Sequence, residues 1–188
     1  MTAPMGLLTD SLERAEAAHL TRPLPKTARA QMRYLTKQTK SARAAAQLLG
    51  VSQRTVERYL AGQIKNPRPD LAHRLAEEVR KRWQPRVRAT ARKQAATSGG
   101  IVIDTRARFG FTADPGTTDD PRLRAITQAL PPTYAARLFD AHAAGAGDQQ
   151  LKDILAEGLQ ESYFKDRGRR ADGLQVEFTD LDYLDLDY

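Results

Sequence analysis

One stretch of 20 residues, 41–60, limits the possible fold of this chain more than any other segment. Ser41 and Ser52 each precede apolar residues at helical spacing, and serine is a favoured helix N-cap. Between the two predicted helices, Gly50 can adopt the left-handed conformation that a sharp turn requires. Small Ala46 lies where the two helices would cross closely. The pattern predicts a helix-turn-helix, in which a short turn joins two helices at a steep angle.

The outward side chains of the second helix suit contact with DNA. A further helix, capped by Thr27, is predicted before the pair, so that three helices share an apolar core. The side chains left outside that core on the second helix of the motif are Gln53, Arg54, Thr55 and Arg58. Arginine can bridge guanine, glutamine can bridge adenine, and threonine can touch a methyl group or a phosphate. An ordinary alanine-rich hairpin with polar residues facing water is the structural alternative.

The positive charge of the chain is concentrated around this motif. The 188 residues include 30 Lys and Arg and 23 Asp and Glu, which gives a net charge of +7. Residues 22–93 alone hold 19 Lys and Arg against four acids, a net charge of +15, whereas residues 94–188 carry −6. A segment that repels itself so strongly favours a polyanion as its partner, and nucleic acid is the leading candidate.

The segment after the motif predicts a second basic surface. Two prolines make residues 65–69 a stiff linker, which carries Lys65 and Arg68. Asp70 is expected to cap the next helix, whose apolar stripe has i, i+4 spacing and consists of Leu71, Leu75, Val79 and Trp83. Its opposite side carries Arg80, Lys81 and Arg82. We interpret these cations, continued by Arg86, Arg88, Arg92 and Lys93, as contacts to the phosphate backbone, which add affinity without sequence choice.

A change of periodicity marks the start of a different region. After two glycines, apolar and polar residues alternate over residues 101–112, which predicts an amphipathic strand. A single strand is not stable, so a partner strand is required. The best internal partner is residues 174–179, which alternate in the same way, and pairing between two copies of the protein would satisfy the same need.

The remaining segments are predicted to be a loop, helices and a tail. Residues 113–121 are rich in turn formers and precede a helix that Asp119 or Asp120 would cap. Residues 133–144 and 149–164 form a helical pair with more acids than bases, which favours a protein-binding hairpin over a second DNA reader. Four aspartates among residues 179–188 predict a disordered acidic tail.

These patterns together predict a mainly α fold. An N-terminal segment (1–21) precedes a basic helix-turn-helix region (22–98), an α+β region with a small β element and a helical hairpin (99–179) and the tail (180–188). The chain has no cysteine and its three histidines are far apart, so no bound metal or other cofactor is expected. No apolar run approaches the roughly 18 residues that span a bilayer, so we expect a cytoplasmic, nucleoid-associated protein without membrane contact.

Six blocks, in this order along the chain, give the sequence a wider resemblance. They are QMRYL (31–35), SQRTVERY (52–59), PRPDL (67–71), KRWQP (81–85), GGIVIDTRARFG (99–110) and YAARLFD (134–140). Together they resemble the telomere terminal proteins of linear actinomycete (Streptomyces-type) chromosomes and plasmids. The resemblance implies a protein that is linked covalently to the 5′ end of DNA. It also implies replicon ends, both duplex and 3′ overhang, a telomere-binding protein and a DNA polymerase as partners.

The resemblance also implies a chemical role for residues 113–121. A threonine hydroxyl there would accept the first nucleotide, and Thr118 is preferred over its neighbour Thr117. Asp119 and Asp120 would orient the hydroxyl or help to hold a metal, although capping the next helix explains them as well. The polymerase would supply Mg²⁺ and the deoxynucleotide, so the protein is expected to be a primer and not an enzyme.

Two other functions remain open from the residues alone. The helix-turn-helix by itself is compatible with a sequence-specific transcriptional regulator that has no covalent role. A plasmid replication or partition accessory protein, which binds DNA and recruits partners through its acidic C-terminal third, is the other alternative.

Overall fold

The computed structural model describes residues 6–112, 123–165 and 175–188, and the chain divides into two compact units. One, the helical unit, is Leu20–Arg86. The other, the sheet unit, joins the described parts of Met1–His19 and Val87–Tyr188. The expected boundaries at residues 21 and 98 therefore differ from the observed ones, since the N-terminal helix and the end of the basic segment both belong with the sheet.

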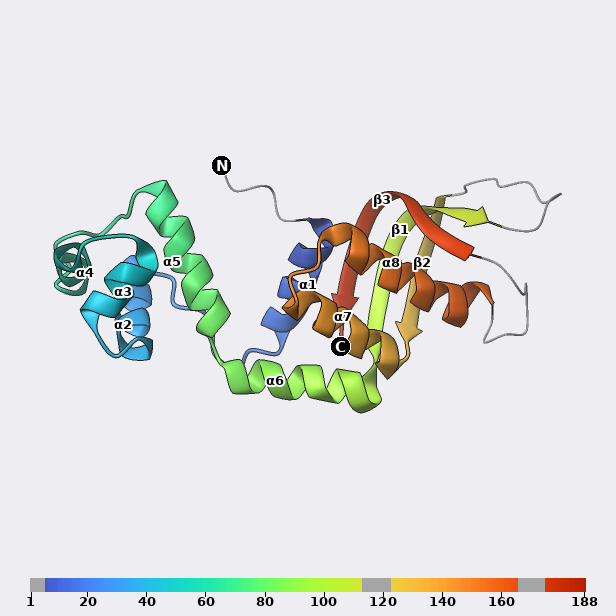
Figure 1. The fold of residues 1–188 in the computed structure, drawn as a ribbon, viewed down its shortest axis with the longest axis horizontal. Helices are drawn as coiled ribbons and strands as arrows, with labels where there is room; N and C mark the ends of the chain where they lie inside the picture. Colours follow the sequence, from blue (N-terminus) through green and yellow to red (C-terminus); the bar gives the residue numbers. More distant parts are fainter. Residues whose placement is uncertain (1–5, 113–122, 166–174) are drawn as a thin grey trace. The chain divides into compact units, whose positions relative to one another are not determined.

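The helical unit contains α2 (Ala28–Gln38), α3 (Ala42–Leu49), α4 (Gln53–Leu60) and α5 (Pro69–Arg82) (Figure 1). The fully buried side chains of its core include Met32, Leu35, Leu49, Val56 and Leu75. These residues come from all four helices, so the core holds the α3-turn-α4 motif against α2 and α5.

The helix starts of this unit follow the predicted caps at three of four positions. The hydroxyls of Thr27, Ser41 and Ser52 each accept a hydrogen bond from the backbone N–H three residues later. The cap expected at Asp70 is wrong. The helix begins two residues earlier than predicted, because Pro69 is its first residue and Arg68 is the N-cap residue.

The end of α5 is anchored by an aromatic pair. Leu71, Leu75 and Val79 are buried as predicted, and Trp83 packs at the edge of the same core. The Trp83 ring meets the Tyr34 ring edge to face with centroids 4.7 Å apart, and its Nε1 donates a 3.0 Å hydrogen bond to the Arg22 carbonyl oxygen. Trp83 therefore belongs to the apolar stripe that the sequence predicts.

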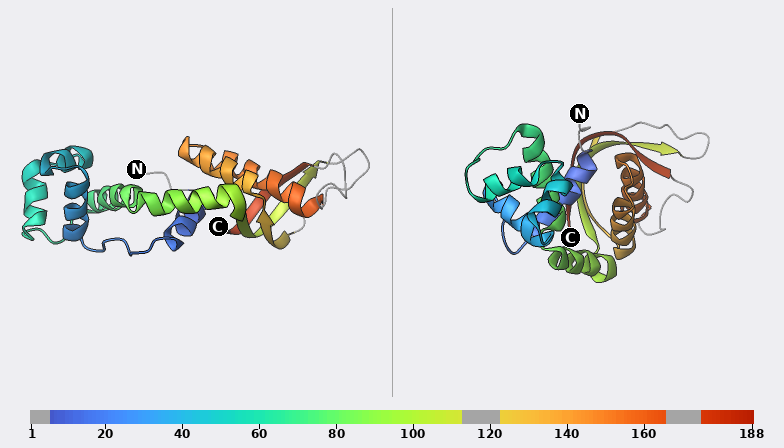
Figure 2. Two further views of the ribbon diagram at one scale, coloured as in Figure 1. Left: turned by 90° about the horizontal axis from the view of Figure 1, so that it is seen from below. Right: turned by 60° about the vertical axis from the view of Figure 1, so that its left-hand side comes forward.

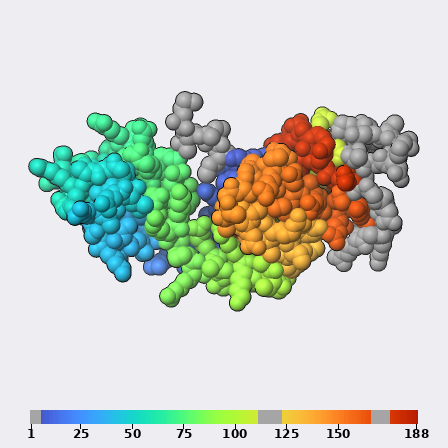
Figure 3. Space-filling view, viewed as in Figure 1, coloured from blue at the N-terminus to red at the C-terminus, as the bar shows by residue number. Residues whose placement is uncertain are grey.

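The sheet unit is built on three antiparallel strands, β1 (Ile101–Thr112), β2 (Leu123–Leu130) and β3 (Gln175–Asp187), in the order β2-β1-β3. Two helices, α7 (Pro132–Ala143) and α8 (Asp148–Leu159), cover one face of the sheet (Figure 2). Their orange and gold surface hides most of the strands in Figure 3. The remaining elements are α1 (Leu7–Ala18), α6 (Pro85–Gln94) and two π-helical turns, Ala95–Gly99 and Gln160–Phe164.

The predicted strand is confirmed, since β1 has the expected bounds and is the central strand. Ile101, Ile103, Ala107 and Phe109 alternate toward the core and are buried. The predicted partner is also confirmed for its described residues, because Phe109 of β1 lies opposite Phe178 of β3. The predicted helical pair is present as α7 and α8, so the expected fold class, mainly α with a small β element, holds.

The helix predicted after residue 121 is wrong, because Leu123–Leu130 is strand β2. Its buried residues are Ile126 and Leu130, four positions apart. A spacing of four matches one turn of a helix and also two periods of a strand, so the apolar pattern alone does not separate the two. This segment forms a strand because it pairs with β1, in which Thr105 lies opposite Ile126.

The predicted disordered tail, residues 180–188, is also wrong. β3 continues to Asp187, and Leu184 and Leu186 are buried in the core. The register against β1 shifts twice, skipping Asp182 and Thr179. These irregularities break the strict alternation by which a strand is recognised in a sequence, and the four aspartates then suggest a solvated tail.

Candidate nucleic-acid interface

The turn between α3 and α4 has the geometry that the sequence predicts. Gly50 adopts φ 65° and ψ 37°, which is the left-handed region. The backbone N–H groups of Gly50 and Val51 donate to the carbonyl oxygens of Gln47 and Ala46, at 3.2 Å and 3.0 Å. Ala46 is 2% exposed, so the small side chain does lie at the close approach of the helices. The turn therefore fixes the direction of α4 relative to α3.

The outer face of α4 carries the four predicted reading residues. Gln53, Arg54 and Arg58 are exposed, and Thr55 is half-buried. The guanidinium groups of Arg54 and Arg58 form no hydrogen bond or ion pair within the described residues, so both are available to bases or phosphates. The structure thus brings the two cations together on one exposed face, one helical turn apart.

The other two reading residues are already engaged inside the helical unit. Gln53 Nε2 donates a 2.8 Å hydrogen bond to Glu57 Oε1, and the hydroxyls of Thr55 and Ser52 are 2.9 Å apart. Gln53 can reach a base only by leaving Glu57. Glu57 was missed as a member of this face, although its i, i+4 spacing from Gln53 is visible in the sequence.

The predicted phosphate contacts differ in their exposure and in the ion pairs that they form. Lys65, Arg68 and Arg80 are exposed. Glu78 instead pairs with Lys81, at 3.7 Å, and more closely with Arg82. Arg82 is also only half-exposed, and its carbonyl oxygen accepts a hydrogen bond from the Tyr34 hydroxyl, so part of this residue serves the aromatic anchor. Burial raises the pKa of Tyr34, although Arg82 and Arg22 oppose the shift.

The basic segment beyond α5 does not form the continuous arm that the sequence suggests. Arg88 and Arg92 of α6 both form ion pairs with Glu16 of α1, whose side chain is only 6% exposed. Neighbouring Tyr188 has its pKa raised to about 12, chiefly by burial and then by the Glu16 charge. These two arginines therefore stabilise the sheet unit, and their interpretation as phosphate contacts is not supported.

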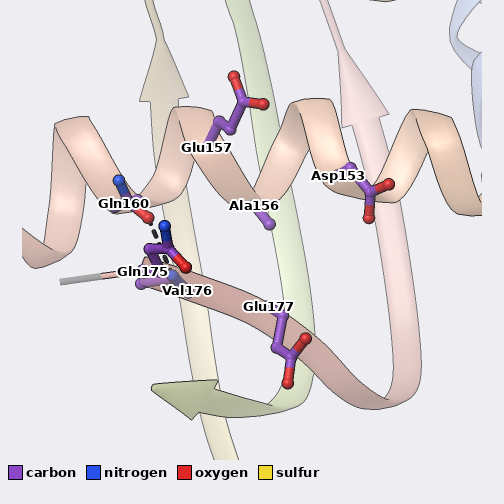
Figure 4. Close-up of a pocket in the computed structure, with 7 residues that line it drawn as sticks. All are labelled: Asp153, Ala156, Glu157, Gln160, Gln175, Val176 and Glu177. Carbon is purple, nitrogen blue, oxygen red and sulfur yellow. Dashed lines mark hydrogen bonds between the residues drawn. The ribbon is translucent and has the colours of Figure 1, made fainter. Parts of the chain in front are cut away.

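The sheet unit has a hollow of its own, of about 430 Å³, between α8 and β3. Asp153 and Glu157 of α8 and Glu177 of β3 are among the residues that border it (Figure 4). The side-chain oxygen of Gln160 accepts a hydrogen bond from the Val176 N–H, and the two atoms are 2.9 Å apart. A border with three carboxylates repels phosphate groups. This hollow is therefore not part of a DNA-binding surface.

The predicted acceptor residues are not placed by the structure. Thr117, Thr118, Asp119 and Asp120 all lie outside the described residues. Within the described ranges, no group of three or more histidine and acidic side chains is arranged to hold a metal ion. No helix in the same ranges has the length and apolar character needed to cross a membrane.

Comparison with known proteins identifies the class of the helical unit. A family model described as helix-turn-helix matches residues 32–82, which run from within α2 to the end of α5. These residues are a DNA-binding domain of the helix-turn-helix class, with DNA as the partner. No curated protein and no solved structure matches the chain.

Proposed function

We propose that this protein is a DNA-binding terminal protein, which caps the 5′ ends of linear replicons and primes synthesis at those ends. The observation that carries the proposal is the exposed face of α4, where Arg54 and Arg58 have no partner within the described residues. The six sequence blocks that resemble terminal proteins of linear actinomycete replicons add the covalent role. Those blocks cover both the helix-turn-helix and strand β1, which leads into residues 113–121.

The proposed chemistry is a nucleotide transfer to a threonine hydroxyl, preferably that of Thr118. The hydroxyl oxygen attacks the α-phosphorus of a deoxynucleoside triphosphate, so that a P–O bond to the threonine forms. The bond to the leaving pyrophosphate breaks, and the hydroxyl proton passes to a base or to water. An unperturbed alcohol is a weak nucleophile, so activation comes from the Mg²⁺ ions at the active site of the polymerase.

Transfer of a labelled nucleotide tests the covalent role directly. The protein is incubated with a replication polymerase or a cell extract, labelled deoxynucleotide and Mg²⁺, and denatured before detection. We expect label on the wild-type chain and none on the Thr117→Ala, Thr118→Ala double variant. Thr127→Ala, which changes an exposed threonine of β2, is the matched control and should keep the label. The single variants then identify which of the two hydroxyls is the acceptor.

Undiminished labelling of the double variant would remove residues 117 and 118 from the mechanism. Mass spectrometry of the protein recovered from nuclease-treated genomic DNA gives an independent answer, because a residual nucleotide mass identifies both the linkage and the residue. DNA ends that carry no covalent protein after denaturation would contradict the terminal-protein role while leaving DNA binding intact.

A sequence-specific regulator without a covalent role is the second candidate function. The matched helix-turn-helix domain favours it, since such a domain is sufficient for duplex recognition without any acceptor threonine. This candidate predicts footprints on internal duplex sites and bare DNA ends. A protease-sensitive block on the 5′ termini of cellular DNA decides against it.

A further inference from the structure

The helical unit contains a hollow that neither the helix-turn-helix motif nor the acceptor chemistry uses. Its volume is about 690 Å³, within the roughly 300 to 1,000 Å³ that is typical of sites for small ligands. Its walls come from three segments, namely the start of α2, the loop that follows α4 and one side of α5. The hollow therefore adjoins the C-terminal end of the helix that carries Arg54 and Arg58.

Two hydrogen bonds hold these walls together. Arg29 Nε donates to the carbonyl oxygen of Leu60, at 3.0 Å, which ties α2 to the end of α4. Gln31 Nε2 donates to the carbonyl oxygen of Pro25, at 2.9 Å, which fixes the segment that enters α2. Gly62, with φ 77°, turns the chain away from α4 at this point. The hollow is consequently part of the folded unit and does not need a ligand to form.

The lining of the hollow combines a cationic rim with an apolar floor. Lys26, Arg29 and Lys65 contribute the positive charge, and none of the residues that line the hollow within the described part of the chain is acidic. Neither lysine takes part in an ion pair or a hydrogen bond with the described residues. The floor includes Ala72 and Ala76 of α5 with Ile64 and Pro67 of the loop.

This chemistry selects a ligand with both negative charge and an apolar face. A phosphate of intact duplex DNA would meet the cationic rim but would leave the apolar floor uncovered. An unpaired nucleotide satisfies both, since its phosphate lies among the cations and its base covers the floor. The adjoining α4 places a DNA strand within reach of the hollow.

We propose that the hollow binds one unpaired nucleotide of a DNA strand whose duplex part lies against α4, so that the helical unit recognises the junction between duplex and single-stranded DNA. The inference rests on DNA binding, which is part of the proposed function, and is independent of covalent attachment. The three cations of the rim favour a strand over a free nucleotide, because several phosphates of a strand can share them.

Binding of matched oligonucleotides to the full-length protein tests this inference by fluorescence anisotropy. The probes are one duplex with blunt ends and the same duplex with a short single-stranded extension at its 3′ or its 5′ end. We expect at least one extended duplex to bind at least about fivefold more tightly than the blunt one. This is the gain in affinity expected at the lower end of the range for one stacked base.

A variant that fills the hollow distinguishes its contribution to DNA binding from that of the outer face of α4. Ala76→Leu narrows the floor without a change of charge, and it should abolish the gain from the extension while leaving blunt-duplex affinity within about twofold. Ala143→Leu, at an exposed position of α7, is the matched control and should keep the gain. Retained blunt-duplex binding also shows that the variant is folded.

Three outcomes would overturn the inference. They are equal affinity for blunt and extended duplexes, a gain that persists in Ala76→Leu, and a gain that is also lost in the control Ala143→Leu. Failure of the wild-type protein to bind any duplex would instead count against the proposed function, so the two failures are distinguishable.

Discussion

The helical unit and the sheet unit use their charges in opposite ways. The helical unit has 16 Lys and Arg against four acids, a net charge of +12, and the sheet unit has 14 against 19, a net charge of −5. Arg54 and Arg58 of the helical unit have no partner within the described residues, whereas Arg106, Arg108 and Arg137 of the sheet unit each face a carboxylate. Arginines that face a carboxylate are partly neutralised within the fold, whereas the guanidinium groups of Arg54 and Arg58 remain available to DNA.

The largest effects are expected when each unit loses part of its core. Leu75 of the helical unit and Leu138 of the sheet unit are both fully buried. Leu75→Ala and Leu138→Ala should each lower the free energy of unfolding by roughly 2 to 5 kcal/mol, because the removed atoms leave a cavity. Differential scanning calorimetry should show that each variant lowers one transition and leaves the other in place. A single transition that moves in both variants would mean that the two units unfold together.

A smaller effect is expected from the buried ion pairs of the sheet unit. Glu16→Gln removes the buried carboxylate that pairs with both Arg88 and Arg92. It should lower the free energy of unfolding by about 3 kcal/mol. Glu78→Gln is the matched change in the helical unit and should cost less than about 1 kcal/mol, since its partners, Lys81 and Arg82, lie on the same helix. Chemical denaturation followed by circular dichroism measures both, and equal losses would contradict the distinction between ion pairs that join two helices and ion pairs within one helix.

Each arginine on the outer face of α4 should contribute about 1 to 3 kcal/mol to the free energy of DNA binding. Arg54→Ala and Arg58→Ala should each weaken binding to the specific site by about this amount. Arg106→Ala and Arg108→Ala make the same change in the sheet unit, where Asp182 and Asp180 are the partners at 3.6 Å and 3.9 Å. These controls should bind DNA as the wild-type protein does. Electrophoretic mobility shifts with specific and non-specific duplexes measure the affinity of each variant for DNA. Weaker binding by the control variants would extend the DNA interface to the sheet unit.

A loss of stability is also expected at alkaline pH. Burial raises the pKa of Tyr188 to about 12, and burial together with the hydrogen bond to Glu161 raises the pKa of Tyr134 to about 12, from 10.0. The folded state therefore favours the protonated phenols, and their contribution to stability is complete below pH 10 and is lost as the pH rises to 12. Thermal melts between pH 9 and 12 should show that the stability of the sheet unit falls as the pH rises.

A double variant tests whether these two tyrosines cause the alkaline loss of stability. Tyr134→Phe with Tyr188→Phe removes both phenols and should flatten the alkaline dependence, whereas Tyr163→Phe changes an exposed tyrosine and is the matched control. A slope that is unchanged in the double variant would show that other groups cause the alkaline loss.

Local signals in the sequence were sufficient for the helix-turn-helix and for β1. The caps at Thr27, Ser41 and Ser52 and the left-handed Gly50 are interactions between residues close in the chain, so their pattern is visible without a structure. The alternation in residues 101–112 is strong enough to identify β1. The same reasoning failed for β2, whose two buried residues have a spacing that helices share, and for the end of β3, where register shifts interrupt the alternation.

The candidate sites show the same division. Arg54 and Arg58 are predictable because a helix places residues four apart on one face. The partner of Arg88 and Arg92 is not predictable, because Glu16 lies more than 70 residues away in the chain. For the same reason, the sequence did not identify Lys26 and Arg29 as neighbours of Lys65 in one hollow.

The sequence by itself determined the helix-turn-helix, the distribution of charge and the central strand, because caps, turns and periodicity act between neighbouring residues. Only the tertiary structure decided which arginines are neutralised, which segments complete the sheet and where the hollow of the helical unit lies. Those features depend on contacts between distant segments, whose free energies become available only when the chain is folded.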